Sequence, residues 1–430
     1  MVGMGKVRMV LLTALLATLL VAASASAQIV LRVATWDGPE GQIPIREVAA
    51  EFEAENPGVQ VQIEQVDDYK ARVIVQVAGG VGPDVFMVGD WDYAEFAASN
   101  VSANLTPYLE RDGVDLSAYI PTLLENHRYV DGQIYSLPKD FSTLGVYYNM
   151  DLFDQAGVPY PEAGWTWDDA WEIARRLTRV GADGEAQSWG ISVNHYWNAV
   201  AWSYAWGDGS LVMSPEYDSV RGYLDSPGTL DAIRTFYERI RDSYGINVPR
   251  AVQDSGGGES GPFISGQAAM LVWGNWAIGQ LLRDQPFRFG TVTPPTRGVN
   301  STTFVMEAGW ALNPNIEDPE RRELAWKLVK KLGTESGQYY MSRNFWAMPS
   351  IPSVAAEIGM TTDPHYGPFF AAAYESMPTY WTKVPLFGQV FDSHYGQIRD
   401  DFLWRDVDLQ VAVSQRIDAI EKALAEGSGE

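Results

Sequence analysis

Three short runs near the start of the chain decide the fold: IVLRVAT at residues 29–35, VQVQI at residues 59–63 and PDVFMV at residues 83–88. The first two alternate apolar and polar side chains, as half-buried strands do, and the third is apolar enough to be buried on both faces. Helical patterns at residues 42–56 and 69–78 separate them. Strand, helix, strand, helix, strand at this spacing predicts a parallel sheet with right-handed crossovers, and therefore an α/β protein.

Aromatic and acidic residues follow these predicted strands. Trp36 and Asp37 come after the first strand, Asp67 and Asp68 after the second, and the run 90–92 (DWD) after the third. The carboxyl ends of parallel strands meet at one edge of a sheet, and ligands of open α/β sheets bind outside that edge. The sequence therefore predicts one rim of a binding crevice at these positions.

A second informative stretch is FISGQAAMLVWGNW at residues 263–276. It predicts a helix that leads into a short buried strand, which ends at Gly274 with Trp273 and Trp276 beside it. A single tryptophan is more often part of a core than of a site. The Gly-Asn pair between these two favours a site, because glycine lets the backbone approach a ligand closely and weakens a strand that only packs.

The rest of the chain continues the α/β pattern. A hairpin is expected at residues 129–138, with its turn at Asp131-Gly132, and the run DSGGGESG at residues 254–261 predicts a flexible surface loop. Further strands are predicted at residues 144–149, 290–293 and 304–312, and further helices at residues 167–177, 230–244, 319–332 and 411–425.

Residues 1–27 have the pattern of a secretory signal peptide. Lys6 and Arg8 precede an apolar run, and Ala25-Ser26-Ala27 matches a small-residue cleavage site. The apolar run is shorter than the about 20 residues that a membrane-spanning helix needs, so an exported mature chain is expected. The sequence has no cysteine, so we expect neither disulfides nor a lipid anchor on an N-terminal cysteine. A free periplasmic protein is favoured, and a protein secreted in another way is the alternative.

Length and charge limit the class of protein further. Single cores stop growing beyond about 250–300 residues, so this chain of 430 residues predicts two large domains. The net charge of −24 disfavours nucleic acid and anionic lipid as partners. The 16 tryptophans and 21 tyrosines favour a ligand with apolar faces, such as a sugar, because flat aromatic rings stack on such faces.

Taken in chain order, these pieces resemble a known family. It is the extracellular solute-binding proteins of ATP-binding-cassette importers, in the carbohydrate-binding group (family 1) that includes maltose-binding protein. The matching pieces cover nearly the whole mature chain: the strand ending in Trp36, Gly82-Pro83-Asp84-Val85, residues 131–135 with Leu137-Pro138, Tyr147-Tyr148-Asn149, residues 165–169, Phe263 to Trp276, Gly309-Trp310 and Met348-Pro349.

The resemblance implies a type II periplasmic-binding-protein fold, with two α/β lobes joined by hinge segments and a ligand cleft between them. The expected hinge crossings lie near Ser142, Met306 and Glu335. The expected N-terminal lobe comprises residues 28–142 plus 307–335, and the C-terminal lobe comprises residues 143–306 plus 336–430. The implied function is to bind a sugar or short oligosaccharide without covalent chemistry and to deliver it to a membrane permease. A monomer without a cofactor is expected.

The resemblance also places candidate ligand contacts, carried over by position. Carboxylates accept hydrogen bonds from sugar hydroxyls, and aromatic faces stack on the C–H surface of a pyranose ring. We expect Trp276 to stack on the ligand and Trp273 to pack. The candidates are Trp36, Asp37, Glu40, Asp90, Trp91, Asp140, Phe141, Tyr196, Trp197, Trp273, Asn275, Trp276, Glu307, Gly309, Trp310, Arg343 and Trp346.

Two alternatives compete with this interpretation. An exported glycoside hydrolase or lyase would also use aromatic clefts and paired carboxylates, but no catalytic signature stands out. The four histidines have no metal-binding or triad spacing, so neither an enzyme nor a metal site is expected. The second alternative keeps the fold and changes the ligand to a polyamine or another non-sugar solute. An acidic cleft in which Asp90, Asp140 and Glu307 face one another would suit such a cation.

Overall fold

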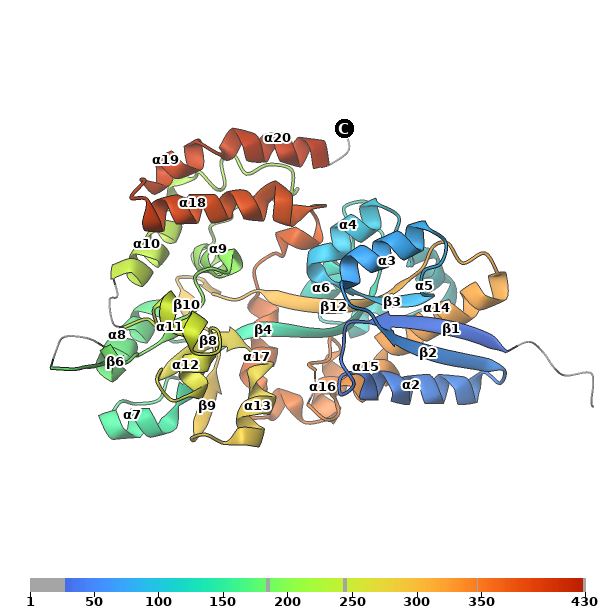
Figure 1. Cartoon of the computed structure of the whole chain (residues 1–430), viewed down its shortest axis with the longest axis horizontal. Coiled ribbons are helices and arrows are strands. Elements are labelled where there is room, and N and C mark those ends of the chain that lie inside the picture. The colour runs from blue at the N-terminus through green and yellow to red at the C-terminus, as the bar shows by residue number, and fades with distance from the viewer. Residues whose placement is uncertain (1–27, 183–185, 243–245, 346, 428–430) are drawn as a thin grey trace, which may run out of the picture.

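A computed structural model describes residues 28–182, 186–242, 246–345 and 347–427. The predicted signal peptide lies outside the described residues. Two α/β lobes lie side by side, and long strands run through the middle of the molecule from one to the other (Figure 1). The strands are β1 (Ile29–Thr35), β2 (Val59–Gln65), β3 (Val85–Gly89), β4 (Leu137–Asn149), β5 (Arg179–Val180), β6 (Ala186–Ser188), β7 (Ser192–Val193), β8 (Met270–Gly274), β9 (Phe289–Val292), β10 (Thr296–Arg297), β11 (Asn300–Ser301) and β12 (Val305–Leu312).

The helices cover these strands in both lobes (Figure 1). They are α2 (Gln42–Glu55), α3 (Tyr69–Ala78), α4 (Tyr93–Ala98), α5 (Thr106–Asp112), α6 (Pro121–Asn126), α7 (Met150–Ala156), α8 (Trp167–Leu177), α9 (Asn198–Trp206), α10 (Pro227–Asp242), α11 (Arg250–Ser255), α12 (Gly261–Ile264), α13 (Ala277–Asp284), α14 (Pro319–Gly333), α15 (Glu335–Ser342), α16 (Pro352–Glu357), α17 (Gly367–Ala372), α18 (Ser393–Trp404), α19 (Leu409–Ser414) and α20 (Ile417–Gly427).

The predicted parallel sheet at the N-terminus is present. β1 pairs in parallel with both β2 and β3, and the full strand order is β2-β1-β3-β12-β4-β8-β7, with β9 also paired to β4. β12 runs antiparallel to β3 and β4, and β8 runs antiparallel to β4 and parallel to β7. The parallel strands of each lobe therefore point their carboxyl ends toward the middle of the molecule.

β4 is the strand that joins the two lobes. Its first half, up to Thr143, pairs with β12, and its second half, from Leu144, pairs with β8. The sequence predicted only the second half, because Pro138, Lys139 and Asp140 interrupt the apolar alternation. The change of partner at Thr143–Leu144 agrees with the expected first crossing near Ser142, and we keep that crossing as a proposal.

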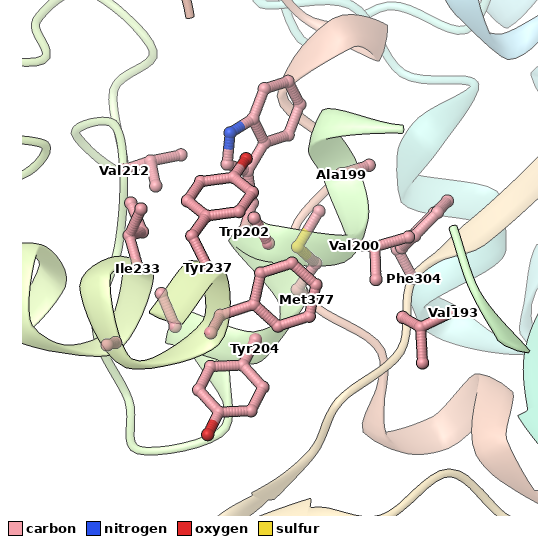
Figure 2. Packing of buried hydrophobic residues seen from close by; sticks show 14 of the residues in the cluster. Val193, Ala199, Val200, Trp202, Tyr204, Val212, Ile233, Tyr237, Phe304 and Met377 are labelled. Carbon is pink, nitrogen blue, oxygen red and sulfur yellow. The ribbon is translucent and has the colours of Figure 1, made fainter. Parts of the chain in front are cut away.

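The core of the C-terminal lobe surrounds α9. Every residue from Asn198 to Ala205 is buried, so this helix is covered on all sides rather than along one stripe. Figure 2 shows Trp202 and Tyr204 of α9 packed among Val212, Ile233 and Tyr237. The N-terminal lobe has a core of its own, which contains Trp310 and Trp326 among other apolar residues.

The third crossing differs from the expectation. Residues after Glu335 still belong with the N-terminal lobe: Ile351 and Val354 lie in its core, and Arg343 pairs with Glu47 of α2 at 2.6 Å. We therefore propose that the chain leaves this lobe beyond Val354 rather than near Glu335.

Three local predictions also need correction. The hairpin at residues 129–138 is shorter than predicted: its turn at Asp131-Gly132 is present and is closed by the antiparallel bridge Arg128–Ile134 and by the hydrogen bond from the Tyr129 N–H to the Gln133 carbonyl at 2.8 Å. The loop predicted at residues 254–261 is shorter, because α11 continues to Ser255 and α12 begins at Gly261. The helix predicted at residues 411–425 is two helices, α19 and α20.

Candidate functional site

Three tryptophans gather at the carboxyl ends of β7 and β8 in the C-terminal lobe. The ring centroids of Trp273 and Trp276 are 5.4 Å apart. The ring centroid of Trp197 lies 6.4 Å from that of Trp273 and 6.5 Å from that of Trp276. The Trp276 side chain is 47% exposed, whereas Trp273 is partly buried and packs against a hydrophobic cluster. Trp273 therefore packs, and the ring of Trp276 is open to solvent; its stacking on a ligand stays a prediction.

Local structure fixes these rings in place. A Cβ atom on Gly274 would lie 1.9 Å from Cζ3 of Trp276, so only glycine lets this indole fold back over the end of β8. Trp197 precedes the buried helix α9, and its backbone N–H donates to Oδ1 of Asn194 at 3.0 Å. Asn275 is buried, and its Oδ1 atom accepts no hydrogen bond from the described residues.

A charged cluster lies at the carboxyl edge of the N-terminal lobe. The ammonium group of Lys139 lies 2.6 Å from Oδ2 of Asp140 and 3.5 Å from Oδ2 of Asp37. Lys139 is only 4% exposed, while both carboxylates are partly exposed. Burial disfavours the charged amine, but the two carboxylates outweigh it and raise the pKa of Lys139 above its ordinary value. The cluster therefore presents two carboxyl groups held by one ammonium group.

Trp36 stands at the same edge. Its ring meets that of Tyr69 edge to face, with centroids 5.0 Å apart, and 38% of the residue is exposed. The Tyr69 hydroxyl donates to the backbone carbonyls of Ala34 (3.0 Å) and Met87 (2.8 Å), and so ties the ends of β1 and β3 together. Trp36 is thus an exposed ring on a fixed support.

Strand β4 connects the aromatic and the charged groups. The carboxyl end of β8 pairs with β4 at Leu144, through Gly274. Asp140 lies four residues earlier on the same strand, which corresponds to about 13 Å of extended chain. A ligand that bridges this distance would contact carboxylates from one lobe and tryptophans from the other.

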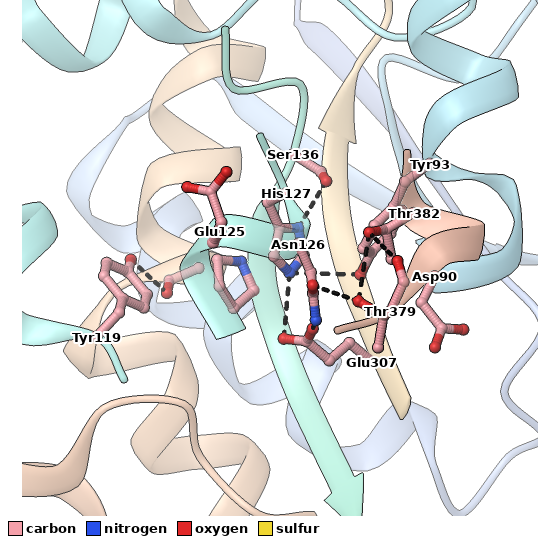
Figure 3. Close-up of polar contacts among 12 residues, drawn as sticks. Asp90, Tyr93, Tyr119, Glu125, Asn126, His127, Ser136, Glu307, Thr379 and Thr382 are labelled. Atoms are coloured by element: carbon pink, nitrogen blue, oxygen red, sulfur yellow. Dashed lines mark hydrogen bonds and ion pairs between the residues drawn. The ribbon is translucent and has the colours of Figure 1, made fainter. Parts of the chain in front are cut away.

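Asp90 and Glu307 are both buried, at 5% and 6% exposure. Figure 3 shows Glu307 beside Asn126 and His127, with Thr379 and Thr382 approaching from a segment near the C-terminus. Asn126 donates to Glu307, Thr379 donates to Asn126, and the indole N–H of Trp381 donates to Asp90 at 2.9 Å.

Burial decides the ionisation of this interior network. It raises the pKa of Asp90 to about 7, although hydrogen bonds from Trp381 and from backbone N–H groups oppose the change. Burial also raises the pKa of Glu307 well above its ordinary value and lowers that of His127 to about 3. The alternative in which Asp90, Asp140 and Glu307 line an acidic cleft is not favoured, because Asp90 and Glu307 are only 5% and 6% exposed, although the charges of Asp90 and Asp140 act on Glu307.

Trp91 bridges the lobes rather than opening into a cleft. Its ring stacks on Trp381, with centroids 4.7 Å apart and planes 5° from parallel. It also packs against Phe387 and the core of the C-terminal lobe. Asp90 and Trp91 together attach the N-terminal lobe to the segment that contains Trp381.

Several other candidates have structural roles in the described state. Trp310 and Phe141 are buried in cores and offer no surface to a ligand. A Cβ atom on Gly309 would lie 2.6 Å from His127, so this glycine permits close packing. Arg343 is engaged with Glu47. We therefore remove these four residues from the proposed contacts.

Of the last three candidates, two lie away from the tryptophans and the charged cluster, and the third lies outside the described residues. Glu40 is exposed in the turn before α2. Tyr196 lies between two guanidinium groups, 4.7 Å from Arg250 and 4.9 Å from Arg399. Trp346 lies outside the described residues. Sequence reasoning missed Lys139 and Asn194; the signal for Lys139 was a lysine next to an aspartate in an otherwise apolar strand.

The described ranges contain neither a metal-binding cluster nor a membrane-spanning helix. No group of three or more histidine, aspartate or glutamate side chains in them could hold a metal ion. Within the same ranges, every helix is too short or too polar to cross a membrane.

Comparison with known proteins defines the class. The family model of bacterial extracellular solute-binding proteins matches residues 38–339. A putative binding protein of Brucella abortus is 26% identical over 341 residues, which cover 78% of this chain and 79% of that protein. A maltotriose-binding protein of Pyrococcus abyssi is 24% identical over 357 residues, which cover 82% and 72%.

Solved structures share the fold. An ABC substrate-binding protein of Listeria monocytogenes, solved with cycloalternan, superposes with a TM-score of 0.75 at 24% identity, over 92% of this chain and 98% of that one. The sugar-binding protein MalE of Xanthomonas citri superposes with a TM-score of 0.77 at 19% identity, over 92% and 98%.

The fold is thus the two-lobed type II fold of periplasmic binding proteins, as expected from the sequence. The chain belongs to the family of bacterial extracellular solute-binding proteins. Since members of this family bind solutes, the expectation that the protein is not an enzyme is confirmed.

Proposed function

We propose that the protein binds a sugar or short oligosaccharide between its two lobes, as the substrate-binding component of an ATP-binding-cassette importer. One observation carries the proposal: the exposed ring of Trp276 follows β8, which pairs with β4 at Leu144, and the paired carboxylates of Asp37 and Asp140 lie at the level of β4 four residues earlier. An aromatic face and charged acceptors together match the two surfaces of a pyranose, its C–H face and its hydroxyl edge. Sugar-binding relatives of the same fold support the ligand class.

The rest of the proposed role follows from the family and the N-terminal sequence. The protein acts as a monomer in the periplasm, after export directed by residues 1–27, and closure on the ligand presents it to the membrane permease. The proposed contacts are the side chains of Trp36, Asp37, Asp140, Trp197, Trp273, Asn275 and Trp276, with Glu40 and Tyr196 at the margin. Trp346 stays a sequence-based proposal.

A polyamine is the less suitable ligand. The carboxyl groups that could have formed a cation site with Asp140 are enclosed, and burial favours their protonated forms. Lys139 further compensates the two carboxylates that do face the cleft.

A thermal-shift panel tests the proposed function. The probes are maltose, maltotriose, trehalose, cellobiose, spermidine and glycine. A ligand at 100 times its dissociation constant adds about 2.7 kcal/mol to the native state, which a melting curve resolves. We expect at least one of the sugars to raise the melting temperature. A rise with spermidine and with none of the sugars would overturn the assignment.

The Trp276→Ala variant locates the site. We expect it to keep a cooperative melting transition and to lose at least tenfold in affinity for the sugar that shifts the wild type. Trp404→Ala is the matched control, because Trp404 is an exposed tryptophan at the end of α18. Equal loss of affinity in the two variants would contradict a stacking role for Trp276.

A further inference from the structure

A β-bulge places the amine of Lys139 in the N-terminal rim of the cleft. Across the β4–β12 pair, Asp140 lies opposite Ala308 and Pro138 lies opposite Gly309, so Lys139 has no partner on β12. In a regular strand, neighbouring side chains point to opposite faces of the sheet. The extra residue breaks this alternation, and Lys139 and Asp140 meet with their charged atoms 2.6 Å apart.

Sheet register brings Asp37 to the same place. Ala308 of β12 lies between Asp140 of β4 and Gly89 of β3. β1 runs parallel to β3, with Ala34 opposite Phe86, so continuing this register three residues further sets Asp37 level with Gly89. Asp37, Gly89 and Asp140 therefore lie at one level of the sheet. The two carboxylates come from segments about one hundred residues apart, and the ammonium group of Lys139 lies within 3.5 Å of both.

Burial of the Lys139 amine strengthens its electrostatic effect on the two carboxylates. Lys139 is almost fully buried, so water screens it little, and the side chains of Asp37 and Asp140 are partly exposed. Oδ2 of Asp37 is buried, and the ammonium group of Lys139 is its partner. Without the amine, two like charges would share one rim with no compensation.

We propose that Lys139 is a positioning residue that sets the ligand class of the cleft: it holds Asp37 and Asp140 as hydroxyl acceptors and keeps the cluster at a single net negative charge, so that neutral sugars bind and amine-bearing ligands do not. This inference rests on the proposed function and assigns a role to a residue that contacts the carboxylates rather than the ligand.

The first test removes the cation. In Lys139→Met, a side chain of similar length fills the buried space and the cluster keeps two uncompensated carboxylates. By isothermal titration we expect at least tenfold weaker binding of the sugar that shifts the wild type, and a gain of at least tenfold in affinity for spermidine. Lys139→Arg restores a positive charge, and we expect it to reject spermidine again. Sugar affinity within twofold of the wild type, with no gain for spermidine, would overturn the proposal.

The second test makes the cluster less negative, whereas Lys139→Met makes it more negative. It does not depend on the folding of Lys139→Met. Asp140→Asn leaves Lys139 paired with Asp37 alone, which makes the cluster neutral. We expect the neutral sugar to bind more weakly and galacturonate to bind at least tenfold more tightly than it does to the wild type. An unchanged affinity for galacturonate would contradict the role of charge balance.

These outcomes are distinct from failure of the proposed function. If the wild-type protein binds no sugar of the panel, the function itself is wrong. If the wild type binds a sugar and neither variant changes charge preference, the function stands and Lys139 has a structural role only.

Discussion

The buried carboxyl group of Asp90 makes the stability of the protein depend on pH. Its pKa is about 7 in the folded state against an ordinary value of 3.8, so the folded state holds the proton more tightly than the unfolded state. The stabilisation from this group is therefore complete below about pH 4 and is lost as the pH rises to about 7. Asp90→Asn removes the titration and keeps an oxygen that can accept from the Trp381 indole.

We expect the stability of Asp90→Asn relative to the wild type to rise by roughly 2–3 kcal/mol between pH 5 and pH 8. Urea denaturation of both proteins at each pH measures this difference. Asp131→Asn is the control, because Asp131 is exposed in a turn. A constant difference between Asp90→Asn and the wild type over this range would show that Asp90 does not retain its proton in the folded state.

The contrast between Trp276 and Trp310 shows which residue-level inferences a sequence permits. The exposure of Trp276 follows from local features, since Gly274 and the end of β8 lie next to it in the chain. The burial of Trp310 depends on β12 lying between β3 and β4, whose residues are about two hundred positions away. Likewise Asp90 is enclosed by Trp381, which no local pattern connects with it.

Helix α8 begins with a capping box. The Thr166 hydroxyl accepts from the Asp169 backbone N–H at 3.2 Å, and the Asp169 carboxylate accepts from the Thr166 N–H at 2.9 Å. The helix packs Trp167 and Trp171 into the core of the C-terminal lobe. The start of α8 therefore affects the lobe that carries the tryptophan cluster.

We expect Thr166→Ala to lower the free energy of unfolding by about 1 kcal/mol, because it removes the cap. Glu172→Ala on the same helix is the control: its partner Arg175 is exposed, and this change should cost less than about 0.5 kcal/mol. Urea denaturation compares the two. Equal costs would indicate that the cap contributes nothing beyond an ordinary surface contact.

Elements with strong local signals could be predicted and those shaped by distant contacts could not. β1 and α3 have the predicted bounds, because β-branched alternation and a closing glycine pair mark them in the sequence. The separation of α19 from α20 has no glycine or proline to mark it. It occurs at Arg416, which pairs with Asp401 of α18 at 2.8 Å, a tertiary contact invisible in the local pattern.

The two-lobed architecture predicts a change of shape when the ligand binds. Closure of hinged lobes around a solute is an established form of conformational change, and the proposed contacts lie on both lobes. We expect small-angle scattering to show a smaller radius of gyration for the wild type with the sugar identified in the thermal-shift panel. Trp276→Ala at the same sugar concentration should keep the radius of the free protein. A decrease of equal size in both proteins would argue against closure driven by this site.

The central place of β12 also has a consequence for the order in which the molecule can form during synthesis. The N-terminal sheet lacks the strand between β3 and β4 until residue 312 has been made, and its core also contains side chains from α14. Before that point the facing edges of β3 and β4 are unpaired, and an unpaired edge is a template on which another chain can pair. More than two thirds of the chain must therefore emerge before this sheet is complete, and the open edges are exposed to wrong pairing during that interval.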